Sequence, residues 1–350
     1  MNPYRNQPSR SFWNNAVSQL QNSFSLSDIA DKKFDIAGLK VATAGSCFAQ
    51  HIGRALQKTN CIVLDVELAP KALPWEERQN HGFGLFSARY GNIYTVRQLL
   101  QIFQEAFGQW TPDEKIWPRG DRYVDPYRPT VEPNGYVSEE TVIKAREFHL
   151  GKVREMFTSC GVFIFTLGLT ESWQAKNDGA VYPVVPGSSA GGVFDAEKYV
   201  FTNFTYDQIL HDLEQFYSQL KKVNKTCKMI LTVSPVALMA TATENHVLVA
   251  NAYSKSVLRA VAGQFTVNKD DVAYFPSYDI CTFPPNGRFF YNSDMRTISS
   301  IGVSFIMGVF KKEYGLHLLN SPSPQHAQNS KKLEIDDVCD EEILAAFNKN

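Results

Sequence analysis

A serine that follows a glycine at the end of an apolar run is the position in this sequence best suited to nucleophilic chemistry. Residues 44–49 have the sequence AGSCFA, between a strand-like run and an amphipathic helical pattern. At such a turn the carboxyl end of a parallel strand meets a helix N-terminus, whose backbone N–H groups favour negative charge. Ser46 is therefore predicted to present its hydroxyl to a ligand and its N–H to an oxyanion. The alternative is that Ser46 only caps the helix, because serine is a favoured N-cap residue.

Cys47 offers a rival nucleophile, because a thiol at a helix N-terminus can be acidified. One residue along a helix turns a side chain by about 100°. Ser46 and Cys47 are therefore not expected to face the same ligand, and Cys47 is expected to pack.

A serine needs a base to accept its proton, and histidine is the usual one. The sequence has seven histidines, at positions 51, 81, 149, 211, 246, 317 and 326. His51 is expected to point away from Ser46, since five residues of helix turn the chain by about 140° and advance it by ~7.5 Å. His246 follows a predicted strand on the side where the site should lie, so it could be a base or substrate contact; the expected alternative is a surface or structural histidine. His81 is a second possibility, in a segment that could fold over the site.

Three further polar positions could hold a substrate or a charge. Arg89 and Arg128 are suited to bind a sugar, carboxylate or phosphate, but Asp125 and Arg128 could instead pair and pin their loop. Lys255 follows Ser254, which resembles a Ser-Lys dyad by residue type. Neighbours on a helix do not face each other, so Lys255 is expected to be structural or a charge at the rim of the site. The histidines and carboxylates lack metal-ligand spacing, so neither a metal nor a cofactor is expected.

The elements that must position these residues follow a strand–helix alternation. Five short apolar runs are typical of strands covered on both faces, and they span residues 39–43, 61–66, 161–167, 228–233 and 272–275. Apolar residues at helical spacing around 48–56, 209–220 and 257–261 separate several of them. This order predicts an α/β fold, a three-layer α/β/α sandwich around a mostly parallel five-stranded sheet.

The remaining segments predict insertions and a tail. Residues 70–136 and 176–203 are rich in Gly and Pro and are expected to be insertions, the first with a helix near 95–107 and the second with a loop or hairpin. Residues 1–319 are predicted to form one α/β domain. Residues 320–350 are predicted to be a polar linker followed by a short acidic helix near 336–347 or by disorder.

Several ordered motifs resemble the GSCFA family, which is part of the SGNH (GDSL-like) hydrolase superfamily. The resemblance covers about residues 1–318 and rests on AGSCFA together with RYGNIYT (89–95), DPYRP (125–129), TLGLTESW (166–173), TVSPV (232–236) and NAYSKSVLRA (251–260). It implies a three-layer α/β/α fold and activity on esters, often O-acyl groups on carbohydrates.

The resemblance also assigns roles to individual residues. Ser46 matches the nucleophile, and Gly91, with Asn92 beside it, matches the glycine that supplies an oxyanion-hole N–H. Thr170 stands where the superfamily has an oxyanion asparagine, and a threonine hydroxyl can donate one hydrogen bond. Glu171, which follows it, and Asn92 are expected to contact the substrate.

The last superfamily block, D-x-x-H, is only half present. Asp294 matches the acid, but Thr297 stands where the histidine base belongs. Threonine cannot act as a base near neutral pH, and loss of a triad member removes orders of magnitude of rate.

Two functions therefore remain open. The first is an SGNH-like serine esterase or acyltransferase acting on an O-acylated carbohydrate or similar ester, and the second is a catalytically impaired module that binds a glycan or a protein partner. With 35 basic and 36 acidic residues the chain lacks the basic surplus of a nucleic-acid binder. Its apolar runs are too short to span a membrane, and its N-terminus shows no secretory pattern, so a cytoplasmic location is expected.

Overall fold

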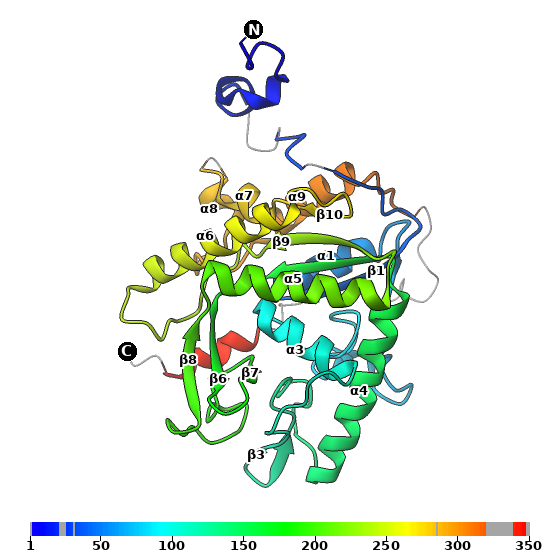
Figure 1. Cartoon of the computed structure of the whole chain (residues 1–350), viewed down its shortest axis with the longest axis vertical. Helices are drawn as coiled ribbons and strands as arrows, with labels where there is room; N and C mark the ends of the chain where they lie inside the picture. Colours follow the sequence, from blue (N-terminus) through cyan, green and yellow to red (C-terminus); the bar gives the residue numbers. More distant parts are fainter. Residues whose placement is uncertain (1, 21–25, 31, 285, 320–338, 348–350) are drawn as a thin grey trace.

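A parallel five-stranded sheet forms the centre of the computed structural model, which describes residues 2–20, 26–30, 32–284, 286–319 and 339–347 (Figure 1). The strand order across the sheet is β2-β1-β5-β9-β10. The strands are β1 (Lys40–Gly45), β2 (Ile62–Val63), β5 (Val162–Leu167), β9 (Lys228–Val233) and β10 (Val272–Tyr274). All four neighbouring pairs are parallel, and each strand lies within or beside a predicted run.

The strand order creates a switch point between β1 and β5. The chain starts in β1, adds β2 on one side, and then crosses to β5 on the other side. Connections leave β1 and β5 in opposite directions, which opens a crevice at their carboxyl ends where α/β proteins of this order bind ligands. Gly45, the last residue of β1, is paired with Thr166 of β5 at this edge.

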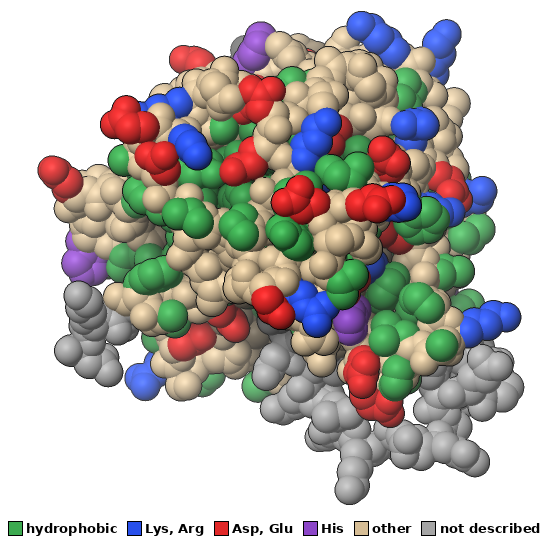
Figure 2. All heavy atoms as spheres, turned by 90° about the horizontal axis from the view of Figure 1, so that it is seen from below, with side chains coloured by type: hydrophobic (Ala, Val, Ile, Leu, Met, Phe, Trp, Pro, Cys, Tyr) green, Lys and Arg blue, Asp and Glu red, His purple; other side chains and the backbone are tan. Residues whose placement is uncertain are grey.

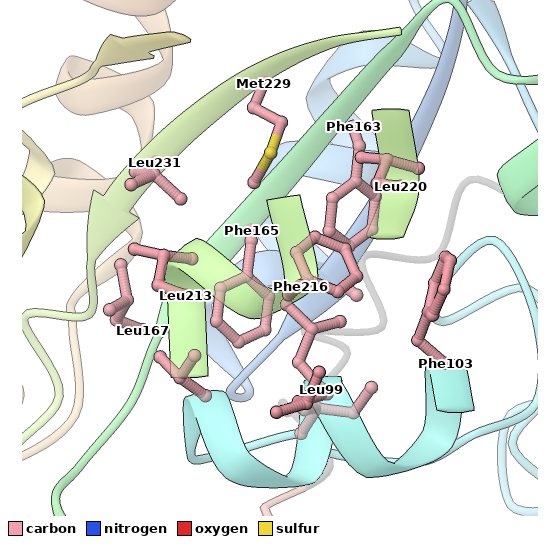
Figure 3. Packing of buried hydrophobic residues seen from close by; sticks show 14 of the residues in the cluster. Leu99, Phe103, Phe163, Phe165, Leu167, Leu213, Phe216, Leu220, Met229 and Leu231 are labelled. Atoms are coloured by element: carbon pink, nitrogen blue, oxygen red, sulfur yellow. The ribbon is translucent and has the colours of Figure 1, made fainter. Parts of the chain in front are cut away.

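Both faces of the sheet are covered by helices, because the strands are apolar on both sides. Phe163, Phe165 and Leu167 of β5 pack in one core with Phe216, while Ile164 packs in a second core. Figure 3 shows the first core between β5, β9, α3 and α5. The helices of the first layer are α3 (Val96–Ala106), α4 (Glu139–Ser159), α5 (Tyr206–Val223) and α6 (Val247–Thr266). Those of the second are α1 (Phe48–Leu56), α7 (Ser277–Thr282), α8 (Gly287–Phe290) and α9 (Ser300–Glu313). The predicted three-layer sandwich is confirmed.

Local capping fixes where several helices begin. Thr95 and Thr205 each form a capping box at the starts of α3 and α5, so the chain leaves its loop at a defined residue. The helix predicted near 95–107 is thus α3. Ser138 caps α4, which carries Arg146 and His149 on its buried face.

The two insertions form small antiparallel sheets on the sandwich. The first contains α2 (Trp75–Arg78) and the hairpin of β3 (Trp117–Arg119) with β4 (Arg122–Val124). The second is more regular than the predicted loop or hairpin, because β6 (Glu171–Ala175) pairs with both β7 (Val181–Tyr182) and β8 (Tyr199–Asn203).

The C-terminal segment returns to the body of the protein. The linker predicted from residue 320 falls on residues 320–338, which lie outside the described residues. The acidic helix predicted near 336–347 corresponds to the 3-10 helix η4 (Asp340–Phe347). Figure 1 shows η4 (red) close to β6 and β7. At the opposite terminus lie η1 (Ser9–Ser11) and η2 (Asn14–Ser18).

The surface carries charges of both signs. On the face seen in Figure 2, acidic, basic and apolar side chains are interspersed. Among the described residues no helix is both long and apolar enough to cross a membrane.

Candidate active site

Ser46 lies at the switch point, between two glycines. Gly45 precedes it at the end of β1, and Gly168 faces it from the turn after β5. Gly45 has a φ of 136°, and a Cβ added to it would lie 2.4 Å from the carbonyl oxygen of Thr166. Across the crevice, a Cβ added to Gly168 would lie 3.0 Å from Ser46 Cβ. The turns after β1 and β5 therefore pack directly on each other, with Ser46 between them.

The Ser46 hydroxyl is buried in a small pocket at this edge of the sheet. Ser46 is 3% exposed, and its Oγ has no hydrogen-bond partner among the described residues. Helix α1 begins at Phe48 with Cys47 as its N-cap residue, and no side-chain cap bond is formed. The hydroxyl is thus available for chemistry, and the alternative in which Ser46 caps the helix is not what the structure shows.

Cys47 packs in the second core, as expected, and it also lines the same pocket as Ser46. The expectation that the two residues do not face one site assumed that both belong to a helix, whereas both precede α1. The thiol of Cys47 is hydrogen-bonded to that of Cys339, a contact that holds the C-terminal segment over the turn.

Lys255 of α6 is a second unexpected component of the pocket. It is 2% exposed, and its Nζ donates to the carbonyl oxygen of Gly168 at 2.6 Å. Of the two expected roles, the buried contact fits a structural residue and not a charge at the rim. Burial lowers the pKa of Lys255 to about 8, against an opposing effect of the nearby Glu341.

The C-terminal segment supplies the outer wall of the pocket. Glu341 lines it and pairs with Arg296 at 3.0 Å. The backbone N–H of Glu341 donates to the Tyr94 hydroxyl at 3.3 Å. Arg296 also donates to Cys339 Sγ at 3.5 Å. The hydrogen bond from Cys47, and after it the positive charge of Arg296, lower the pKa of Cys339, while burial raises the pKa of Glu341.

An apolar pocket of about 190 Å³ adjoins the Ser46 pocket and shares Tyr94, Leu169, Leu238 and Glu341 with it. Aromatic side chains from the second insertion form much of its wall, namely Trp173, Tyr182 and Phe201. Leu344 of η4 closes one side. The two pockets together provide a nucleophile beside a space suited to an apolar group.

Glu171 lies in this apolar pocket, as expected of a substrate contact. Its carboxylate accepts hydrogen bonds from Thr241 Oγ1 at 2.8 Å and from the N–H of Ala242 at 3.4 Å. Burial raises its pKa.

The predicted oxyanion donors are engaged elsewhere in this structure. The Ser46 N–H donates to the carbonyl oxygen of Thr166 at 3.2 Å, and the Thr170 hydroxyl donates to Asn203 Oδ1 at 2.6 Å. Asn92, expected as a substrate contact, donates from Nδ2 to Asp340 of the C-terminal segment at 2.9 Å. Gly91, with a φ of 68°, packs near Val131 and is not among the residues lining the pocket.

Asp294 and Thr297 stay together but do not line the Ser46 pocket. The Thr297 hydroxyl donates to Asp294 Oδ2 at 2.7 Å, and Asn292 Nδ2 donates to Thr297 Oγ1 at 2.9 Å. Asp294 instead lines an open groove beside η4. It is Arg296, between them, that reaches the pocket wall through Glu341.

Arg128 is held in a buried ion cluster. It contacts Asp125 at 2.9 Å and Glu67 at 3.4 Å, and its side chain is 1% exposed. This is the loop-pinning alternative, and the described geometry leaves Arg128 away from the Ser46 pocket. Arg89 is used in a similar way, since it pairs with Glu132 of the same insertion.

The six histidines that the structure describes are all placed outside the Ser46 pocket. His246 is exposed and caps α6, where its Nδ1 accepts from the N–H of Leu248 at 3.1 Å. His81 lies 3.1 Å from Glu132, and the buried His149 lies 2.7 Å from Glu67. His326 lies outside the described residues.

The fold and the site define a class of protein, a doubly wound α/β protein with a buried serine at its switch point. The sequence profile of the GSCFA family matches residues 40–310, which span the whole sheet and most of both pockets. The chain belongs to the GSCFA family. A comparison with curated proteins gives no match.

Proposed function

We propose that the chain is a serine esterase or acyltransferase of the SGNH type, acting on an O-acylated carbohydrate or a similar ester. Ser46 is the nucleophile. The observation that carries this proposal is the unpartnered, buried hydroxyl of Ser46 at the β1/β5 switch point, beside an apolar pocket. By motif position, Asp294 and Thr297 correspond to the SGNH acid and base. Gly91 and Thr170 correspond to residues of its oxyanion hole.

The apolar pocket accommodates the acyl group of the substrate. Its wall of Trp173, Tyr182 and Phe201 excludes water from an alkyl chain, while Glu171 and Gln98 contribute polar atoms. Each buried methylene contributes about 0.8 kcal/mol, which corresponds to a roughly fourfold gain in kcat/KM for every methylene that reaches the wall.

Turnover of nitrophenyl esters tests the proposal. Acetyl, butyryl and hexanoyl esters should be hydrolysed, with kcat/KM rising along the series, and Ser46→Ala should lower kcat at least ~100-fold. Ser256, an exposed serine of α6, provides a matched control, because Ser256→Ala removes a hydroxyl outside both pockets. Turnover that is equal in the two variants would exclude Ser46 as the nucleophile.

A second function, a catalytically impaired module that binds a glycan or a protein partner, is favoured by one observation. Asp294 and Thr297 hydrogen-bond to each other and are absent from the pocket lining. Under this alternative, calorimetry shows binding of an acylated oligosaccharide that the protein leaves intact.

The activity of the unaltered chain separates the two functions. If the chain is an impaired module, it should bind the acylated oligosaccharide and leave both that compound and the nitrophenyl esters intact. Measurable turnover by the unaltered chain would exclude the impaired module.

A further inference from the structure

The Ser46 pocket contains an amine that the SGNH motifs leave without a role. Lys255 Nζ donates to the carbonyl oxygen of Gly168 at 2.6 Å, and Gly168 packs against Ser46. Both Lys255 and Ser46 line the same small pocket. The amine is thus brought to the nucleophile through a single intervening residue.

The surroundings of Lys255 make its proton easier to lose than that of an exposed lysine. The Gly168 carbonyl is the one hydrogen-bond acceptor that the described residues give to Nζ, whereas an ammonium group has three protons to donate. The side chain is almost completely buried. A buried ammonium with one acceptor is costly, which agrees with a pKa lowered to about 8.

The charged and titratable groups that face Lys255 come from three elements. Glu341 and Cys339 belong to the C-terminal segment, Cys47 to the turn after β1, and Arg296 to the loop before α9. Glu341 and the two thiols oppose the effect of burial on the pKa of Lys255, and Arg296 adds to it. Glu341 is itself a weaker candidate for the base, because its carboxylate is paired with Arg296.

We propose that Lys255 is the proton acceptor for Ser46, in the role that histidine has in SGNH enzymes; this inference rests on the proposed function. The neutral amine takes the proton of Ser46 Oγ as that oxygen bonds to the ester carbonyl carbon. The resulting ammonium returns the proton to the leaving alkoxide as the carbon–oxygen bond of the ester breaks. Water or an acceptor alcohol then attacks the acyl-serine, gives its proton to Lys255, and releases Ser46, which regains that proton.

The test uses the full chain and two readouts, hydrolysis of nitrophenyl butyrate and mass-mapped labelling of Ser46 by a fluorophosphonate. Lys255→Met removes the amine, and Lys255→Arg keeps the positive charge but cannot lose a proton near neutral pH. Both should lower each rate ~100-fold or more. Lys222→Met, at an exposed lysine of α5, and His326→Ala should stay within about threefold of the unaltered chain.

The dependence of kcat/KM on pH distinguishes Lys255 as a base from Lys255 as a merely structural residue. A base must be deprotonated, so kcat/KM should rise with pH in a step centred near the pKa of about 8 and level off at higher pH, where the amine is neutral. Glu341→Gln removes a negative charge that raises the pKa of Lys255, so the rise should move to lower pH. This measurement does not depend on the folding of a Lys255 variant.

The outcomes distinguish failure of the proposed function from failure of the role of Lys255. If Ser46 of the unaltered chain does not react with the fluorophosphonate, and the chain hydrolyses no ester at any pH, the proposed function fails, and the role of Lys255 fails with it. If Ser46 reacts and Lys255→Met or Lys255→Arg keeps that rate, the proposed function stands and the role of Lys255 is overturned. A rise in rate centred near pH 6.5 that disappears in His326→Ala would assign the base to His326.

Discussion

Replacement of Gly45 by alanine probes the turn that presents Ser46. The φ of 136° at Gly45 lies where an L-residue is strained, at a cost of about 1–3 kcal/mol. The added Cβ would also lie 2.4, 2.7 and 2.8 Å from the backbone oxygen, backbone nitrogen and Cβ of Thr166. Relief of this overlap needs a shift of β1 against β5 and costs a further ~1–3 kcal/mol. Gly45→Ala should therefore lower the free energy of unfolding by roughly 2–6 kcal/mol.

Gly38 supplies the matched control for this prediction. It also has a positive φ, 74°, but an added Cβ would have no atom within 4 Å. Gly38→Ala should cost only the conformational strain, about 1–2 kcal/mol. Urea unfolding followed by circular dichroism measures both values, and an insoluble Gly45→Ala beside a soluble Gly38→Ala would agree with the same reasoning.

The Gly45 substitution should also change the chemistry of the site. The Ser46 N–H donates to the Thr166 oxygen at 3.2 Å, so a shift between the strands displaces Ser46. Labelling of Ser46 by a fluorophosphonate should slow in Gly45→Ala and stay unchanged in Gly38→Ala. Equal stability and equal labelling of the two variants would refute the close packing of β1 on β5 at this turn.

Three more predictions concern the buried cluster and the C-terminal segment. Arg128→Met should lower the free energy of unfolding by about 3–5 kcal/mol in urea titrations, because it leaves buried carboxylates without their partner; a cost below ~1 kcal/mol would contradict this. Burial, and after it the charge of Arg128, lowers the pKa of His149 to about 4, so between pH 6.5 and 4 the unfolded chain binds a proton that the folded chain does not. Stability should fall as the pH drops through this range, with a shallower slope in His149→Gln, and equal slopes would count against the buried neutral imidazole. Asp340→Ala removes hydrogen bonds to a buried carboxylate worth about 1.5–3 kcal/mol, so the C-terminal segment should open more often and expose Cys47. Alkylation of Cys47 by iodoacetamide should then speed up roughly 10- to 100-fold. Phe347→Ala, at an exposed position, should leave the alkylation rate unchanged.

The sequence was sufficient to predict the sheet and several helices of the two layers. Strands such as β5 and β9 are continuous apolar runs, and the buried faces of α1 and α5 follow helical spacing. These signals are local, so they do not depend on which segments later meet. The position of Ser46 at the end of β1 follows from the same local pattern.

Helix α4 was not predicted, because its buried face is partly charged. Arg146 and His149 lie among its buried residues, and their partners, Glu67, Glu105 and Asp125, come from other parts of the chain. A pattern of apolar residues cannot show that a charged side chain is buried when its counter-charge is distant in sequence.

The C-terminal wall of the site was missed for a related reason. Asp340 is buried because Asn92 and Thr130 donate to it across more than 200 residues of sequence. The acidic helix was predicted, but its docking depends on these remote donors. For Lys255 the sequence left a structural role and a charge at the rim open, because helix neighbours do not face each other. Its burial depends on the C-terminal segment and the Gly168 carbonyl, which come from distant parts of the chain.

Peptide-mapped labelling with a serine-reactive fluorophosphonate tests the central claim most directly. An activated serine reacts with this reagent because a neighbouring base takes its proton, whereas an ordinary hydroxyl does not. We predict stoichiometric labelling of the full chain at Ser46, faster at pH 9 than at pH 7, and none at that peptide in Ser46→Ala. An unlabelled Ser46 across this pH range would contradict a catalytic serine at the β1/β5 switch point.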